Sequence, residues 1–170
     1  MQSVLPANII DLAVRVVAEN TVLGRTVALA ESCTGGLVAA AITEVPGSSA
    51  MFGSGYVTYA NDAKMKMLGV NEDILETFGA VSVATAWAMA QGALKKSGAD
   101  IAVAISGVAG PDGGTEKKPV GTVVFAVAEK GRDPNEVNAD RMEFGSDKSR
   151  AEIRTIATLH ALALLLPSTP

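Results

Sequence analysis

Three apolar runs of strand length constrain the fold of this chain more than any other feature. They occupy residues 26–30 (TVALA), 101–106 (IAVAIS) and 122–128 (TVVFAVA). β-Branched side chains favour extended backbone, and an unbroken apolar run is typical of a strand that is covered on both faces. The pattern therefore predicts a central sheet with helices packed on each side.

Segments with helical spacing of apolar residues alternate with these runs and predict the layers that cover the sheet. Over residues 9–20, for example, apolar side chains recur at intervals of three and four. Asn61 and Ser82 are candidate N-caps of later helices. The last helix has two candidate caps, Asp147 and Ser149. The predicted helices cover residues 9–20, 36–45, 62–68, 72–78, 83–97 and a last segment that ends at 166.

Two more strands and one long loop complete the pattern. Glycines interrupt the strand predicted at 51–60, which suggests a bend or bulge, and charges on 138–144 indicate an edge strand. Residues 107–121 (GVAGPDGGTEKKPVG) lack the Walker and dinucleotide-binding fingerprints, and we interpret them as a flexible rim over a site. The order of elements predicts the α/β class, as a three-layer α/β/α sandwich with a mixed, mostly parallel sheet.

Length, charge and cysteine count exclude several classes of protein. With 170 residues, 48% of them hydrophobic, the chain can bury one core, so we expect a single domain over residues 1–170. A net charge of −4 argues against a nucleic-acid partner. No apolar run approaches the ~18 residues of a membrane helix, and the N-terminus does not resemble a secretory signal. One cysteine permits no intramolecular disulfide, and we expect a cytoplasmic protein.

The single histidine limits the available chemistry. His160 lies among alanines and leucines at helical spacing, where a packed histidine is more common than a catalytic one. A Ser-His-Asp triad would need this residue as its base. The chain has no HExxH or CxxC pattern, and we expect neither a metal nor another cofactor.

A strand, a tight turn and a helix N-terminus meet at residues 28–36 (ALAESCTGG). Unpaired N–H groups and the helix dipole favour an anion or an oxyanion at such a junction. Ser32 has the placement of a nucleophile, although on spacing alone an N-cap is the more common role, for which Thr34 competes. Cys33 is a rival nucleophile, because a helix N-terminus stabilises a thiolate. Since adjacent side chains point in different directions, only one of Ser32 and Cys33 can face a substrate in that way.

A serine nucleophile needs a base, and the chain offers lysine, carboxylate or tyrosinate groups. Lys64 and Lys66 follow the predicted strand at 51–60, and a lysine can act as a base if burial lowers its pKa. Either could instead be a solvated lysine on a short helix. Arg150 and Arg154 lie four residues apart on one helix face, where they could clamp a phosphate or simply face solvent.

Six sequence blocks, in this order, resemble those of the CinA C-terminal domain family over nearly the whole chain. The blocks are AESCTGG (30–36), VPGSS (45–49), GYVTYAN (55–61) with the following Lys64, GAVS (79–82), SGVAGPDGG (106–114) and KPVGTV (118–123). Stand-alone members of that family are nicotinamide-nucleotide amidohydrolases. The resemblance implies hydrolysis of the carboxamide of nicotinamide mononucleotide to nicotinate mononucleotide and ammonia, in pyridine-nucleotide recycling.

The resemblance also implies roles for particular residues. Ser32 would be the nucleophile and Lys64 the general base, with Tyr59 in support. TYAN stands where the family more often has TYSN, and SDKSRAEIR departs from the family pattern near the last helix, so that either arginine could be the family's. Further residues are expected to bind the substrate, the first three through their backbone N–H groups: Thr34, Gly35, Gly36, Asn61, Gly107, Arg150 and Arg154.

Two further expectations concern the oligomeric state and a second activity. A homodimer is plausible for a small acidic enzyme with a small-molecule substrate. Some family members are fused to a second domain that acts on ADP-ribose, and 170 residues leave no room for it, so that activity is expected to be absent.

The alternative function is a catalytically silent nucleotide-binding or regulatory module of the competence/damage-inducible type.

Overall fold

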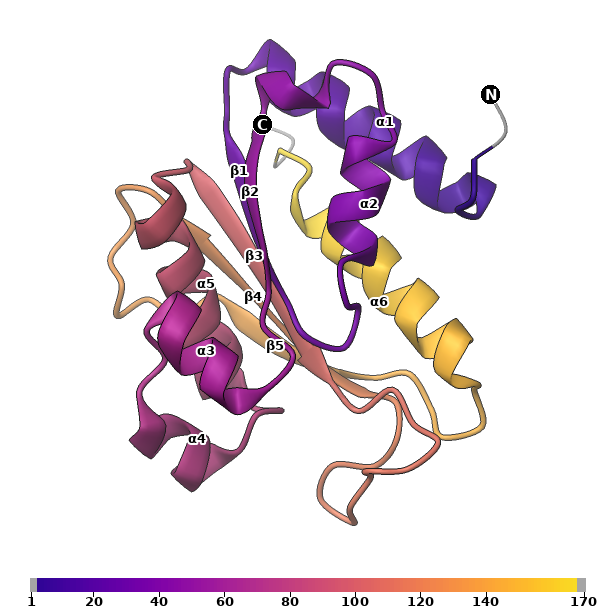
Figure 1. Ribbon diagram of the computed structural model, residues 1–170, viewed down its shortest axis with the longest axis vertical. Helices are drawn as coiled ribbons and strands as arrows, with labels where there is room; N and C mark the ends of the chain where they lie inside the picture. Colours follow the sequence, from indigo (N-terminus) through magenta and orange to yellow (C-terminus); the bar gives the residue numbers. More distant parts are fainter. Residues whose placement is uncertain (1–2, 168–170) are drawn as a thin grey trace.

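The computed structural model describes residues 3–167 and has a central sheet between two layers of helices (Figure 1). The five strands lie in the order β2-β1-β3-β4-β5. Their bounds are β1 (Val27–Glu31), β2 (Phe52–Val57), β3 (Ile101–Gly107), β4 (Thr122–Glu129) and β5 (Ala139–Glu143).

The strand directions explain why one edge of the sheet collects polar groups. β1 pairs in parallel with both β2 and β3, whereas β4 is antiparallel to β3 and to β5. Four strands therefore run in one direction and β4 runs in the other, which confirms the mixed sheet, with two parallel and two antiparallel strand pairs. The carboxyl ends of β1, β2 and β3 lie together, and the residues that follow them meet at that edge.

Helices cover both faces of the sheet. On one face lie α1, α2 and α6, and on the other α3, α4 and α5 (Figure 1). Alternate residues of β1 enter the two cores, with Leu29 facing the first layer and Ala28 and Ala30 facing α5. The helix bounds are α1 (Ala7–Val22), α2 (Leu37–Thr43), α3 (Asn61–Leu68), α4 (Glu72–Phe78), α5 (Val83–Ser97) and α6 (Arg150–Leu164).

A glycine inside α5 sets how closely α3 can approach. A Cβ added at Gly92 would lie 2.0 Å from the carbonyl oxygen of Leu68, the last residue of α3. A mid-helix glycine costs about 1 kcal/mol relative to alanine. Here it allows the helix that carries Lys64 to pack directly on α5, so the sequence gives up helix propensity for close contact.

Most predicted elements are confirmed, with shifts at their ends. β1 extends one residue further than expected, to Glu31, and its register with β2 shifts between Val27 and Ala28, as the predicted bulge requires. Ser149, rather than Asp147, caps α6, in a capping box with Glu152. The N-cap prediction for Asn61 is wrong, because Asn61 is the first residue of α3 and no side chain caps that helix.

Over residues 3–167, none of the helices is both long and apolar enough to cross a bilayer.

Candidate active site

The turn after β1 places Ser32 at the carboxyl edge of the sheet. The Ser32 N–H donates to the Ile105 carbonyl at 2.9 Å, which extends the β1–β3 ladder one residue past the strand. Gly35 and Gly36 then adopt φ values of 61° and 99°, a left-handed conformation that glycine tolerates readily. The chain reverses within four residues, and the Ser32 side chain is left at the wall of a cavity.

Lys64 contacts Ser32 from α3, a helix on the opposite face of the sheet from α2. The residue lies on α3, is 1% exposed, and places Nζ 3.1 Å from the Ser32 Oγ. Nζ also donates to the carbonyl oxygens of Thr58 (2.9 Å) and Tyr59 (3.1 Å). Carbonyl oxygens can only accept, so a neutral amine uses its two N–H groups there and keeps its lone pair for the Ser32 hydroxyl. That is the arrangement a general base needs.

Burial lowers the pKa of the Lys64 amine, because the charged form loses its hydration. Among the described residues, no carboxylate lies within ion-pair distance of Nζ to offset this effect. Lys66, the other candidate base, is exposed and forms an ion pair with Asp62 at 2.8 Å. The structure therefore favours Lys64 over Lys66 as the base.

The lowered pKa of Lys64 predicts how the rate depends on pH. Below that pKa the amine is protonated and cannot accept the serine proton, so we expect kcat/KM to rise with pH and level off below the ordinary lysine value of 10.5. The profile is measured from pH 5 to 10, with circular dichroism at each pH to confirm that the protein stays folded. A rate that falls over this range in folded protein would exclude an amine base.

Cys33 is the less suitable of the two adjacent nucleophiles. Its side chain is 4% exposed, and burial raises the pKa of the thiol to about 11. At neutral pH the group is therefore a thiol, which is a poor nucleophile.

We expect Cys33→Ala to keep kcat within about threefold of wild type, since the buried thiol stays protonated at neutral pH. The assay is steady-state ammonia release, with iodoacetamide treatment of the wild-type protein as a second measurement. A loss of turnover as large as that caused by removing the Ser32 hydroxyl would instead make Cys33 the nucleophile.

The N-terminus of α2 is not open to an external anion, because the Glu31 carboxylate occupies it. The Gly36 N–H donates to Glu31, and the Gly35 N–H donates to the Ser32 carbonyl. Thr34 is fully buried, and its hydroxyl also donates to Glu31. Two of the three N–H groups expected to hold an oxyanion are thus already engaged, which corrects the expectation for Gly35 and Gly36.

The cavity beside Ser32 has a volume of about 270 Å³ and draws its walls from six parts of the chain. Arg150, at the start of α6, donates from Nη1 to the Gly110 carbonyl (2.7 Å) and from Nη2 to the Tyr59 hydroxyl (2.9 Å). Ser106, 1% exposed, donates to the Ala80 carbonyl at 2.8 Å. The residues with polar side chains in this lining are Ser32, Cys33, Tyr59, Lys64, Ser106, Asp112 and Arg150.

Half of the sequence-predicted site residues lie in this cavity: Ser32, Tyr59, Lys64, Gly107 and Arg150. Tyr59 contacts Lys64 through its carbonyl oxygen, while its hydroxyl contacts Arg150. Arg154 lies one turn further along α6 and donates to the carbonyl oxygens of Cys33 and Thr34 at 3.1 and 3.0 Å. It therefore supports the turn and does not line the cavity.

Asn61 also lies outside the cavity and lines a separate depression on the surface, beside α4. Sequence reasoning gave no role to Ser106 or Asp112, although both lie in the blocks that carry the family resemblance. Asp112 had a further signal, because it lies in the long loop that was interpreted as the rim of a site, whereas Ser106 lies in the central strand before that loop.

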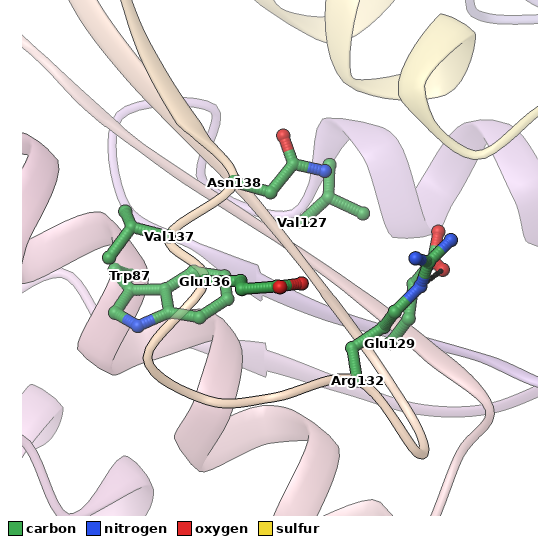
Figure 2. A pocket seen from close by; sticks show the side chains of 7 residues that line it. All are labelled: Trp87, Val127, Glu129, Arg132, Glu136, Val137 and Asn138. Carbon is green, nitrogen blue, oxygen red and sulfur yellow. Dashed lines mark hydrogen bonds and ion pairs between the residues drawn. The ribbon is translucent and has the colours of Figure 1, made fainter.

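A second, larger cavity of about 420 Å³ shares no lining residue with the first (Figure 2). Trp87 of α5 faces the connection between β4 and β5 there, and its indole N–H donates to the Pro134 carbonyl at 3.1 Å. Glu129 and Arg132 form an ion pair at 3.3 Å. This lining contains no serine, cysteine or lysine, whereas the candidate nucleophile Ser32 and the candidate base Lys64 both line the smaller cavity.

His160 and the acidic groups offer no alternative centre. The His160 ring packs on Phe125 with centroids 4.4 Å apart, which confirms a packed histidine, and burial lowers its pKa. Across residues 3–167, no group of three or more histidine, cysteine, aspartate or glutamate side chains is placed to hold a metal ion.

Comparison with known proteins identifies the family to which the chain is similar. The profile of the CinA C-terminal domain matches residues 10–169. Nicotinamide-nucleotide amidohydrolase PncC of Enterobacter agglomerans is 48% identical over 144 residues, which cover 85% of this chain and 86% of that protein. A CinA-like protein of Akkermansia muciniphila is 53% identical over 139 residues, 82% of this chain. The chain spans about a third of the length of the first CinA-type relatives that it matches.

Solved structures share the whole fold. The crystal structure of competence/damage inducible protein CihA from Agrobacterium tumefaciens superimposes with a TM-score of 0.91 at 48% identity, covering 96% of this chain and 97% of that one. A competence-damaged protein (CinA) superfamily protein from Escherichia coli gives a TM-score of 0.86 at 34% identity, covering 97% and 93%.

Proposed function

Because the chain belongs to the CinA C-terminal domain family, we propose that it is an amidohydrolase that converts nicotinamide mononucleotide and water to nicotinate mononucleotide and ammonia. The observation that carries this proposal is the 3.1 Å contact between the Ser32 Oγ and the buried Lys64 Nζ. The 48% identical relative named as such an amidohydrolase supports the substrate class.

Acylation starts with the hydroxyl of Ser32. Its oxygen attacks the carboxamide carbon while the neutral Lys64 amine takes the hydroxyl proton. When the tetrahedral intermediate collapses, the carbon–nitrogen bond breaks and the Lys64 ammonium gives that proton to the leaving nitrogen, which departs as ammonia. The product of this half-reaction is an ester between the pyridine carbonyl and Ser32.

Deacylation uses the same two groups in the opposite sense. The oxygen of a water molecule attacks the ester carbon while the Lys64 amine takes a proton from that water. The Lys64 ammonium then gives a proton to the Ser32 oxygen as the ester bond breaks and nicotinate mononucleotide leaves. The carbonyl oxygens of Thr58 and Tyr59 hold Nζ in place in both protonation states, because the ammonium can donate to both carbonyls and to Ser32.

Arg150 is the group best placed to bind the 5′-phosphate. Its guanidinium lines the cavity and uses only part of its five N–H donors on Gly110 and Tyr59. The site needs no metal to activate the amide, since the cationic pyridinium ring already withdraws electrons from the carbonyl carbon.

The test is to incubate the purified protein with nicotinamide mononucleotide and quantify ammonia and nicotinate mononucleotide, which we expect in a 1:1 ratio. Nicotinamide riboside, which lacks the phosphate, is the matched comparison. It should show a higher KM because it offers no phosphate for Arg150 to bind. If the nucleotide binds and no ammonia appears, the chain is a silent nucleotide-binding module and the proposal fails.

A further inference from the structure

The carboxylate of Glu31 accepts four hydrogen bonds from the turn that contains Ser32 and from the start of α2. Glu31 is the last residue of β1 and is 1% exposed. Its Oε2 accepts from the Thr34 hydroxyl (2.7 Å) and from the N–H groups of Gly36 (3.0 Å) and Val38 (3.2 Å). Its Oε1 accepts from the Ala39 N–H at 2.9 Å. The α2 N–H groups, rather than a cation, therefore stabilise this buried carboxylate.

The backbone of the same residue reaches the other half of the site. The Glu31 carbonyl accepts from the Thr58 N–H at 2.8 Å. The Thr58 carbonyl in turn accepts from Lys64 Nζ. Residue 31 is thus bonded through its side chain to the segment that follows Ser32 and through its main chain to the segment that holds Lys64.

We propose that Glu31 is a positioning residue whose carboxylate holds the Ser32 turn so that the hydroxyl stays within reach of the Lys64 amine. The inference rests on the proposed function, and Glu31 acts through Ser32 without touching the substrate. Because an internal carboxylate occupies the start of α2, the phosphate of the substrate is left to Arg150. Removing the charge should therefore affect the chemical step more than substrate binding.

The test variant is Glu31→Gln, which keeps the size and shape of the side chain. Its amide oxygen can replace Oε2 and keep three of the four bonds, but its NH₂ group then faces the Ala39 N–H, donor against donor. We expect kcat to fall by about 10²-fold, the effect of a displaced reacting group, with KM within about threefold of wild type.

Labelling of Ser32 by a fluorophosphonate probe measures the reactivity of the hydroxyl without the nucleotide. We expect the labelling rate of Glu31→Gln to fall in parallel with its kcat. This readout separates the two proposals, because wild-type protein that labels quickly but releases no ammonia would contradict the proposed function and leave the role of Glu31 measurable.

Two more variants guard against a purely structural explanation. Thr34→Val removes one bond to Glu31 and keeps the charge, so it should lower kcat and labelling in the same direction but less, and its effect should not add to that of Glu31→Gln. Asn71→Ala removes the side-chain cap of α4, far along the chain from the turn, and should lower stability while leaving kcat unchanged. Folded Glu31→Gln protein with wild-type kcat and labelling, or with a changed KM alone, would overturn the inference; if Glu31→Gln does not fold, an unchanged Thr34→Val would do so.

Discussion

Replacing Ser32 with alanine is expected to lower kcat for nicotinamide mononucleotide by about 10⁴-fold or more. Without the hydroxyl no acyl-enzyme can form, and removal of a nucleophile in serine hydrolases has effects of this size. The change removes one atom from a side chain that is 8% exposed, and the Lys64 amine keeps its bonds to Thr58 and Tyr59. The protein should therefore fold normally and still bind the nucleotide.

The measurement is ammonia release under saturating substrate, combined with calorimetric binding of the nucleotide to the variant. Cys33→Ala is the matched control, since it removes the neighbouring side chain of almost the same size. Mass spectrometry of quenched wild-type reactions should find the acyl group on the peptide that contains Ser32. Turnover of Ser32→Ala above about 1% of wild type would exclude this residue as the nucleophile.

Replacing Lys64 with methionine should lower kcat by about 10³- to 10⁴-fold, because the serine loses its base and the leaving nitrogen loses its acid. Lys64→Arg should be equally inactive, since a guanidinium stays protonated at any pH where the protein folds. Lys66→Met is the matched control on the same helix: Lys66 is exposed, so its replacement should leave kcat unchanged. Activity of Lys64→Met close to that of Lys66→Met would show that another group takes the serine proton.

Lys64→Met also tests the lowered pKa of Lys64, through the pH dependence of the free energy of unfolding. The pKa of this amine is lower in the folded chain than in the unfolded chain, so between the two values the unfolded chain binds more protons. Stability should then rise with pH over that interval in wild type and rise less in Lys64→Met. Urea unfolding at several pH values measures the difference. At neutral pH, Lys64→Met leaves two carbonyl oxygens without a hydrogen-bond donor. Its free energy of unfolding should therefore fall below that of wild type by at most the cost of these two unpaired groups, about 1–3 kcal/mol each.

The helices and strands could be predicted well from the sequence because each is encoded by local pattern. The three apolar runs are the three buried strands β1, β3 and β4, and α4 and α5 begin and end where their capping residues and glycines indicate. The prediction was wrong at Asn61, where the extended Ala60 rather than a polar side chain starts α3. A preference for asparagine at caps is weak when the rest of the helix is held by packing on α5.

The choice between two arginines needed the tertiary structure. Arg150 and Arg154 have the same chemistry and lie on one face of α6, so spacing alone could not separate them. In the fold, Arg150 in the first turn of α6 lines the cavity, and Arg154 in the second turn contacts the segment that follows Ser32. Arg150 consequently contacts Tyr59 and Gly110, while Arg154 contacts the main chain of residues 33 and 34.

By itself, the sequence determined the layers of the sheet, the strand–turn–helix that carries Ser32 and the short list of possible bases, because these depend on neighbours along the chain. Only the tertiary structure decided that Lys64 is buried against Ser32 and that Glu31, not a ligand, occupies the start of α2. The physical reason is that a lysine pKa and a reactive hydroxyl depend on what surrounds them in space. Those surroundings come from three strand ends that lie far apart in the sequence.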